Sequence, residues 1–185
     1  VNEGEIQGDN QISIIANDTK NSGRIFSFAN IDIDSNLIQN DLDIIAGNKM
    51  TIVGSSMNNS GRMVSGDDTD LTISSDINNS GLLQSNKNIA ILSNTVHNSG
   101  SIKGGDQLIM NAKIATNNGA IISNGNLNLD LTHQYINNGA LYSNAAANIA
   151  AKTIKNNGQI KASGNVSLAT TSMHQDGLVF TSRNA

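Results

Sequence analysis

Hydrophobic residues recur along this chain with a period of 19 or 20 residues. An Asn-x-Gly turn marks the period, and its third position falls at Gly4, Gly23, Leu42, Gly61, Gly81, Gly100, Gly119, Gly139, Gly158 and Gly177. The residue two positions later is always aliphatic or Met: Ile6, Ile25, Ile44, Met63, Leu83, Ile102, Ile121, Leu141, Ile160 and Val179. Because this pattern runs from end to end, residues 1–185 are predicted to form a single repeat array.

Three short segments of each repeat place apolar side chains on one side. Apolar residues stand two, eight and ten positions after the turn glycine, and a further column lies four positions before the next one. A spacing of two is typical of a β-strand, and the unit is too short for a helical solenoid. The pattern predicts an all-β parallel β-helix of about nine to ten coils. Equivalent residues would stack at roughly 4.8 Å, which gives a rod of about 45–50 Å.

Two other folds with short repeats were weighed. A left-handed β-helix is the nearer alternative, because the spacings between inward segments are close to six, but that fold is built from strict hexads. The extra residue in every coil argues against it. A leucine-rich repeat has a suitable length, but its Leu-x-x-Leu-x-Leu signature does not recur in this chain.

The turn residues fit the same register. Two positions before each turn glycine the chain has Asn in nine repeats and Gln175 in the tenth. Gly and Asn tolerate left-handed backbone angles, so we expect positive φ in these turns, and the stacked amides should hydrogen-bond along the column. Leu42 interrupts the glycine column. We expect Asn40 or Asp41 to adopt the positive φ there, in the least secure coil.

Composition removes several classes of function. The chain has no Cys, so disulfides, thiolate metal sites and thiol nucleophiles are excluded. Its net charge is −4 and only 14% of its residues are charged. A nucleic-acid partner is therefore not expected, because such proteins carry clustered basic residues. No apolar run approaches the length of about 18 residues that a membrane-spanning helix needs.

The repeat unit resembles a known family. The segment Asn58 to Ser65, which reads Asn-Asn-Ser-Gly-Arg-Met-Val-Ser and is followed by alternating apolar residues, is similar to the haemagglutinin-type repeat of filamentous haemagglutinin. Such repeats occur in large two-partner-secretion exoproteins, including contact-dependent growth inhibition effectors. The likeness extends from Gly4 to about Thr181. It implies a right-handed β-helical shaft, secreted through an outer-membrane two-partner-secretion transporter and displayed on the bacterial cell surface.

One outward column is a candidate partner-binding stripe. Three positions after the turn glycine stand Phe26, Ile45 and Val64 on consecutive rungs, with Phe28 beside them, and Ile122 and Tyr142 further along. An exposed apolar patch of this kind often marks a contact surface. The alternative is that a neighbouring loop or the amino-terminal segment covers the stripe.

Other chemistry-bearing residues favour a structural interpretation. His97 and His174 lie four coils apart and cannot share a metal ion, and His133 has only Asp130 near it in the sequence. Asp67, Asp68 and Asp70 could attract Ca²⁺, but a solvated acidic face accounts for them better. We expect no metal site, no cofactor and no catalytic residues.

These observations lead to three ranked hypotheses. The first is a monomeric, non-catalytic shaft segment, excised from a longer exoprotein, that holds an adhesive or toxin-delivering region away from the cell. The second is direct binding of a receptor or glycan on the target cell through the stripe. The third is an enzyme that acts on polysaccharides, which is remote because uniform coils leave no room for the long loops that build a cleft.

Overall fold

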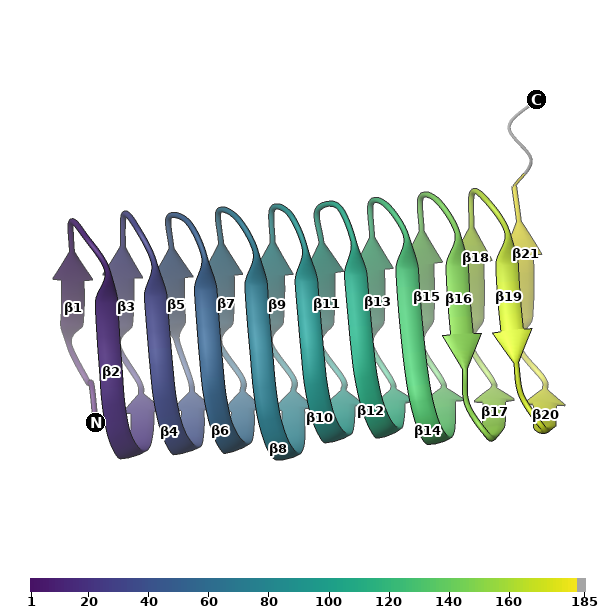
Figure 1. Cartoon of the computed structure of the whole chain (residues 1–185), viewed down its shortest axis with the longest axis horizontal. Helices are drawn as coiled ribbons and strands as arrows, with labels where there is room; N and C mark the ends of the chain where they lie inside the picture. Colours follow the sequence, from purple (N-terminus) through teal and green to yellow (C-terminus); the bar gives the residue numbers. More distant parts are fainter. Residues whose placement is uncertain (183–185) are drawn as a thin grey trace.

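The chain winds into a right-handed parallel β-solenoid of about nine turns (Figure 1). The computed structural model describes residues 1–182. In Figure 1 the front strands run downward and the back strands upward while the chain advances from left to right, which is a right-handed winding. The described part of the chain contains no α-helix with the length and hydropathy that a membrane crossing requires. The predicted all-β fold, its coil length and its handedness are confirmed.

One wall of the solenoid is a ten-stranded parallel sheet, here called the short-strand sheet. Each of its strands has four residues and follows one Asn-x-Gly turn. In spatial order these strands are β1 (Glu5–Gly8), β3 (Arg24–Ser27), β5 (Asp43–Ala46), β7 (Arg62–Ser65), β9 (Leu82–Ser85), β11 (Ser101–Gly104), β13 (Ala120–Ser123), β15 (Ala140–Ser143), β18 (Gln159–Ala162) and β21 (Leu178–Thr181).

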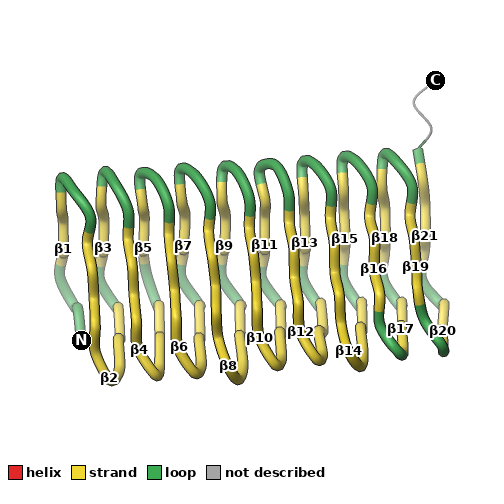
Figure 2. The backbone as a smooth tube through the Cα atoms, viewed as in Figure 1, coloured by secondary structure: helices red, strands yellow, loops and turns green. Residues whose placement is uncertain are grey.

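The remaining wall is the long-strand sheet, whose strands bend around a corner (Figure 2). Its continuous strands are β2 (Ile12–Asn21), β4 (Ile31–Asn40), β6 (Met50–Asn59), β8 (Thr69–Asn79), β10 (Ile89–Asn98), β12 (Leu108–Asn117) and β14 (Leu127–Asn137). In the last two coils the strand divides into β16 (Ala147–Ala150) with β17 (Thr153–Asn156), and β19 (Val166–Ala169) with β20 (Ser172–Gln175). Three separate short segments per coil, as predicted, therefore occur only there; elsewhere two of the three join into one bent strand.

Equivalent residues of successive repeats pair directly, as the columns predict. Ile25 pairs with Ile44, and the next rung pairs Ile44 with Met63. All three side chains are at most 1% exposed. The apolar columns therefore form continuous ladders through one core, and each coil buries its residues mainly against the two coils beside it.

The two repeats of 20 residues place their extra residue at the bend of the long strand. β8 and β14 have eleven residues, whereas the other continuous long strands have ten. The pairing register shifts at this point, between Gly54 and Ser56 of β6 and between Ala112 and Ile114 of β12. Each insertion is thus absorbed as a β-bulge, and both flanking ladders keep their register.

The bend also contains an inward column that the sequence reasoning missed. Its buried members stand twelve positions after the turn residue: Ser35, Ile73, Ser93, Ala112, Leu131 and Ala151. The column mixes hydroxyls, small residues and large aliphatics, so no hydropathy pattern distinguishes it. Its serines bond to other groups; the Ser93 hydroxyl, for example, donates to the Ser75 and Thr95 carbonyls.

The predicted reason for the turn glycines is wrong. No glycine or other described residue has a positive φ, so neither Asn40 nor Asp41 takes up a left-handed conformation beside Leu42. Glycine is needed because the turns stack closely. A Cβ added at Gly100 would overlap the carbonyl oxygen of Gly81, and seven other turn glycines have the same relation to the coil before them. Close backbone approach, rather than backbone conformation, selects glycine here.

Leu42 is accommodated by a small local opening. The amide of Asp43 donates to the Gly23 carbonyl at 3.3 Å, whereas the equivalent hydrogen bonds of the other turns measure 2.6–2.9 Å. The leucine side chain is about half exposed. The turn therefore makes room for one Cβ by lengthening one hydrogen bond.

Tyr135 is a buried polar residue without a partner. It stands on the rung between Ala115 and Ile154, is fully buried, and its hydroxyl has no hydrogen-bond partner among the described residues. We expect Tyr135→Phe to raise the free energy of unfolding by about 1 kcal/mol, because the unsatisfied hydroxyl is removed and the ring is kept. Urea unfolding would measure the gain. Tyr142→Phe, which loses an exposed bond to Gln159, is the matched control and should change little.

The same variant has a pH signature. Burial raises the pKa of Tyr135 above its ordinary value of 10.0. The folded state therefore keeps the neutral phenol while the unfolded state ionises, so this contribution is fully present below pH 10 and is lost as pH rises above it. The stability of wild type should fall faster than that of Tyr135→Phe above pH 10. Parallel stability curves for the two proteins would contradict this assignment.

Candidate functional site

The predicted stripe forms two patches on the outer face of the short-strand sheet. Phe26, Ile45 and Val64 pair on consecutive rungs, and Ile122 pairs with Tyr142. Gln84 and Lys103 occupy the two rungs between the patches. Phe28 is 58% exposed, while the other five side chains are partly exposed. The structure therefore brings the first four residues together and separates them from the last two.

The aromatic end of the first patch is ordered by its neighbours. The rings of Phe26 and Phe28 meet edge to face, with centroids 4.6 Å apart, a favourable geometry for an aromatic pair. The Arg24 guanidinium lies 4.5 Å from the centroid of the Phe26 ring and also pairs with Glu5 at 2.9 Å. Cation–π contact and ion pair together hold the Phe26 ring in place.

No described segment crosses this patch. The chain is used up by the strands and short turns of the coils, and its amino-terminal segment continues the stack, where Asn2 pairs with Asn21 (Figure 1). A covering loop or amino-terminal segment, the alternative considered from the sequence, does not occur within residues 1–182. The first patch is available to a partner.

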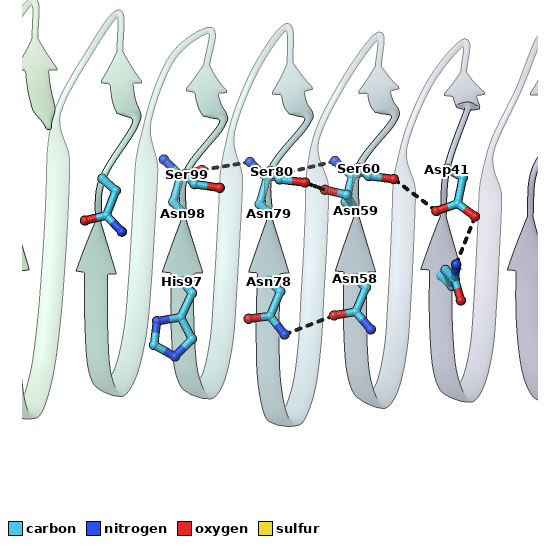
Figure 3. Close-up of a pocket in the computed structure, with 12 residues that line it drawn as sticks. Asp41, Asn58, Asn59, Ser60, Asn78, Asn79, Ser80, His97, Asn98 and Ser99 are labelled. Atoms are coloured by element: carbon cyan, nitrogen blue, oxygen red, sulfur yellow. Dashed lines mark hydrogen bonds between the residues drawn. The ribbon is translucent and has the colours of Figure 1, made fainter.

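A second surface feature is a polar groove of about 590 Å³ along the Asn turns (Figure 3). Here the chain turns its Asn side chains inward, so the residues on either side of each Asn point outward and form two parallel rims. One rim carries Asn58, Asn78 and His97, and the other carries Ser60, Ser80 and Ser99 (Figure 3). The sequence reasoning identified the turn but not the groove, because the groove exists only when the coils are stacked.

The floor of the groove is a saturated ladder of amides. Each buried Asn donates from Nδ2 to the Oδ1 of its equivalent in the next coil, as Asn59 does to Asn79 at 2.7 Å and Asn79 to Asn98 at 2.8 Å. The same Nδ2 atoms also donate to backbone carbonyls, such as that of Leu82. The floor therefore stabilises the fold, and only the rims can offer hydrogen bonds to a ligand.

The rims are polar and almost uncharged. Asp41 is the only carboxylate among the residues that line the groove, and it accepts hydrogen bonds from Ser60 at 3.0 Å and from Gln39 at 2.9 Å. No Lys or Arg lines it. Such a surface suits a neutral ligand rich in hydroxyl or amide groups. His97 lies on the rim without a carboxylate partner among the described residues, so the geometry gives it no orienting group for acid–base chemistry.

The acidic residues weighed for Ca²⁺ have other partners. Lys49 pairs with Asp70 and Lys87 with Asp67, both at 2.6 Å. The hydrogen bond to its carboxylate, together with the attraction of the negative charge, raises the pKa of each lysine above 10.5. Asp68 accepts hydrogen bonds from the side chain and backbone of Asn88. Residues 1–182 contain no group of three or more His, Asp or Glu side chains placed to hold a metal ion.

No protein-family model matches this chain, and no curated protein or solved structure matches it. The likeness to the haemagglutinin-type repeat therefore stays a prediction from the repeat unit. The site has to be judged on the geometry of the apolar patch and the polar groove alone.

Proposed function

We propose that this chain is a shaft segment of a large secreted or surface-displayed bacterial exoprotein, where it holds an adhesive or toxin-delivering region away from the cell. The observation that supports this proposal most is the unbroken ladder of buried Asn side chains, which joins every coil to the next. It makes the segment a continuous rod. The repeat unit from Asn58 to Ser65 supports the kind of parent protein, which would be exported by an outer-membrane two-partner-secretion transporter.

The uniformity of the coils also supports a spacer role. Every described coil has 19 or 20 residues, and the extra residues enter bulges rather than loops. The two solvent-exposed features, the apolar patch and the polar groove, are shallow, and neither brings together a pair of carboxylates. We therefore propose a mechanical role and no catalytic one.

Removal of one whole coil tests the shaft role. Deletion of residues 81–99 joins two equivalent positions, so the ladders can re-form in register. In the parent exoprotein, the deletion should shorten the rod by about 4.8 Å and leave secretion and surface display intact, as seen by electron microscopy and by antibody labelling of unbroken cells. A deletion of ten residues is the out-of-register control and should abolish folding. Labelling only after the cells are broken would contradict the proposed location.

Direct binding is a second candidate function, favoured by the patch of Phe26, Phe28, Ile45 and Val64. An ordered aromatic pair that nothing covers is a suitable anchor for a receptor. The partner would be a protein or glycan on the target cell surface. The polar groove, with its amide and hydroxyl rims, adds a surface that suits a glycan.

Paired surface variants separate the two functions. Phe26→Ser with Val64→Ser should weaken attachment to target cells by about tenfold or more if the patch is an anchor. Gln84→Ser with Lys103→Ser changes the same outward ladder outside the patch and is the matched control. Cell-binding assays with folded, monodisperse protein would measure the difference. Equal attachment by both double variants would remove the binding role and leave the shaft role standing.

A further inference from the structure

The chain contains four Asn-Gly bonds in two kinds of turn. Asn118-Gly119, Asn138-Gly139 and Asn157-Gly158 lie in successive Asn-x-Gly turns, whereas Asn124-Gly125 lies in the turn between β13 and β14. In an Asn-Gly sequence the glycine nitrogen can attack the side-chain carbonyl carbon of Asn, because no Cβ on the glycine hinders it. The structure treats the four sites differently.

The three turns of the stacked series are held by hydrogen bonds on both reacting groups. The amides of Gly119, Gly139 and Gly158 each donate to a buried Asn carbonyl in the preceding coil, at 3.0–3.1 Å. Their Asn side chains form an outer ladder, in which Asn138 donates to Asn118 at 2.8 Å and Asn157 donates to Asn138 at 2.7 Å. Attack would require both sets of hydrogen bonds to break.

Asn124-Gly125 lacks these restraints. Within residues 1–182 the Gly125 amide donates to no acceptor, and the Asn124 side chain takes part only in a long contact of 3.4 Å from Asn144. Asn124 is exposed and borders an open hollow of about 260 Å³ between coils, so water reaches it. Nucleophile, carbonyl and leaving group are all free.

We propose that Asn124 is a site of spontaneous, self-catalysed deamidation in the folded protein. The Gly125 nitrogen gives its proton to water or hydroxide and bonds to Cγ of Asn124, the side-chain nitrogen leaves as ammonia, and a succinimide ring closes. Water then opens the ring at either carbonyl. The products are aspartate and isoaspartate, each with one new negative charge.

The modification changes the turn that carries it. Gly125 stacks tightly on the preceding coil, because a Cβ there would overlap the carbonyl of Asp106, and the Asn124 amide donates to Gly104 at 3.0 Å. Isoaspartate adds one methylene to the main chain at this point. The coil should then lose its stacking register locally, which would make Asn124 a marker of the age of a long-lived surface protein.

The test is a time course on the intact chain at mildly alkaline pH, with peptide mapping by mass spectrometry at all four sites. Asn124 should react about tenfold or more faster than each of the three ladder sites, because each of those must first break hydrogen bonds. In denaturing urea the four rates should converge. The Asn124→Gln variant should lose most of the ammonia release from the folded protein. A native rate at Asn124 equal to or below that of the ladder sites would overturn the proposal, as would unequal rates that persist unchanged in urea.

Discussion

Replacing Asn79 with alanine should lower the free energy of unfolding by about 3–5 kcal/mol, because it leaves several buried polar groups without partners. Asn79 is 1% exposed. Its Nδ2 donates to Asn98 at 2.8 Å and to the Ser101 carbonyl at 3.2 Å, and its Oδ1 accepts from Asn59 at 2.7 Å. Alanine removes all of these bonds at once and interrupts the ladder between two coils. Urea unfolding followed by circular dichroism would measure the loss.

The preceding residue provides a close control. Asn78 has the same side chain but points outward, where it makes one exposed hydrogen bond to Asn58 at 3.0 Å. Asn78→Ala should therefore stay within about 0.5 kcal/mol of wild type. Similar losses for the two variants would show that the buried ladder is not what joins the coils.

Gly100→Ala should destabilise the protein by about 3 kcal/mol, at the upper end of overpacking effects. The added Cβ would overlap the Gly81 carbonyl oxygen and crowd the backbone of Ser80. Backbone atoms of a stacked turn cannot move aside without stretching the hydrogen bond from Ser101 to Gly81, now 2.9 Å. The free energy of unfolding is again the measurement.

Gly4→Ala tests the same substitution where the space is open. Gly4 belongs to the same column, but a Cβ there has no atom within 4 Å. The variant should unfold within about 0.5 kcal/mol of wild type. If Gly100→Ala were equally harmless, close stacking would not be the reason for the glycine column. A loss at both positions would instead implicate the conformational freedom of glycine.

The sequence was sufficient to predict the ladders but not the details of how the coils bend. The columns led by Ile25 and Ile44 and the inward Asn column could be predicted because stacking repeats each choice of residue on every rung. The position of the extra residue in β8 and β14 could not, since a bulge at the bend and a longer turn give the same period. The mixed column of Ser35 and Ile73 carries no hydropathy signal either.

The site was predictable only in part, for a related reason. The outward column of Phe26, Ile45 and Val64 follows from the period alone, so its register is confirmed, but whether it binds a partner stays a prediction. The groove beside Asn58 and His97 depends on the distance between two rims that come from different sides of a turn. No one-dimensional pattern contains that distance. The turn glycines show the same limit, because a close approach between coils looks, in sequence, like a need for positive φ.

The inner ladder of Asn side chains also has a direction. All nine of its hydrogen bonds, from Asn2 to Gln175, run the same way, with the amide nitrogen of one coil donating to the carbonyl oxygen of the next. Aligned dipoles in a buried row reinforce one another. The outer Asn pairs run in the opposite sense but lie in water, which weakens their field. The rod is therefore electrically asymmetric along its length, with the positive pole of the inner row toward Gln175.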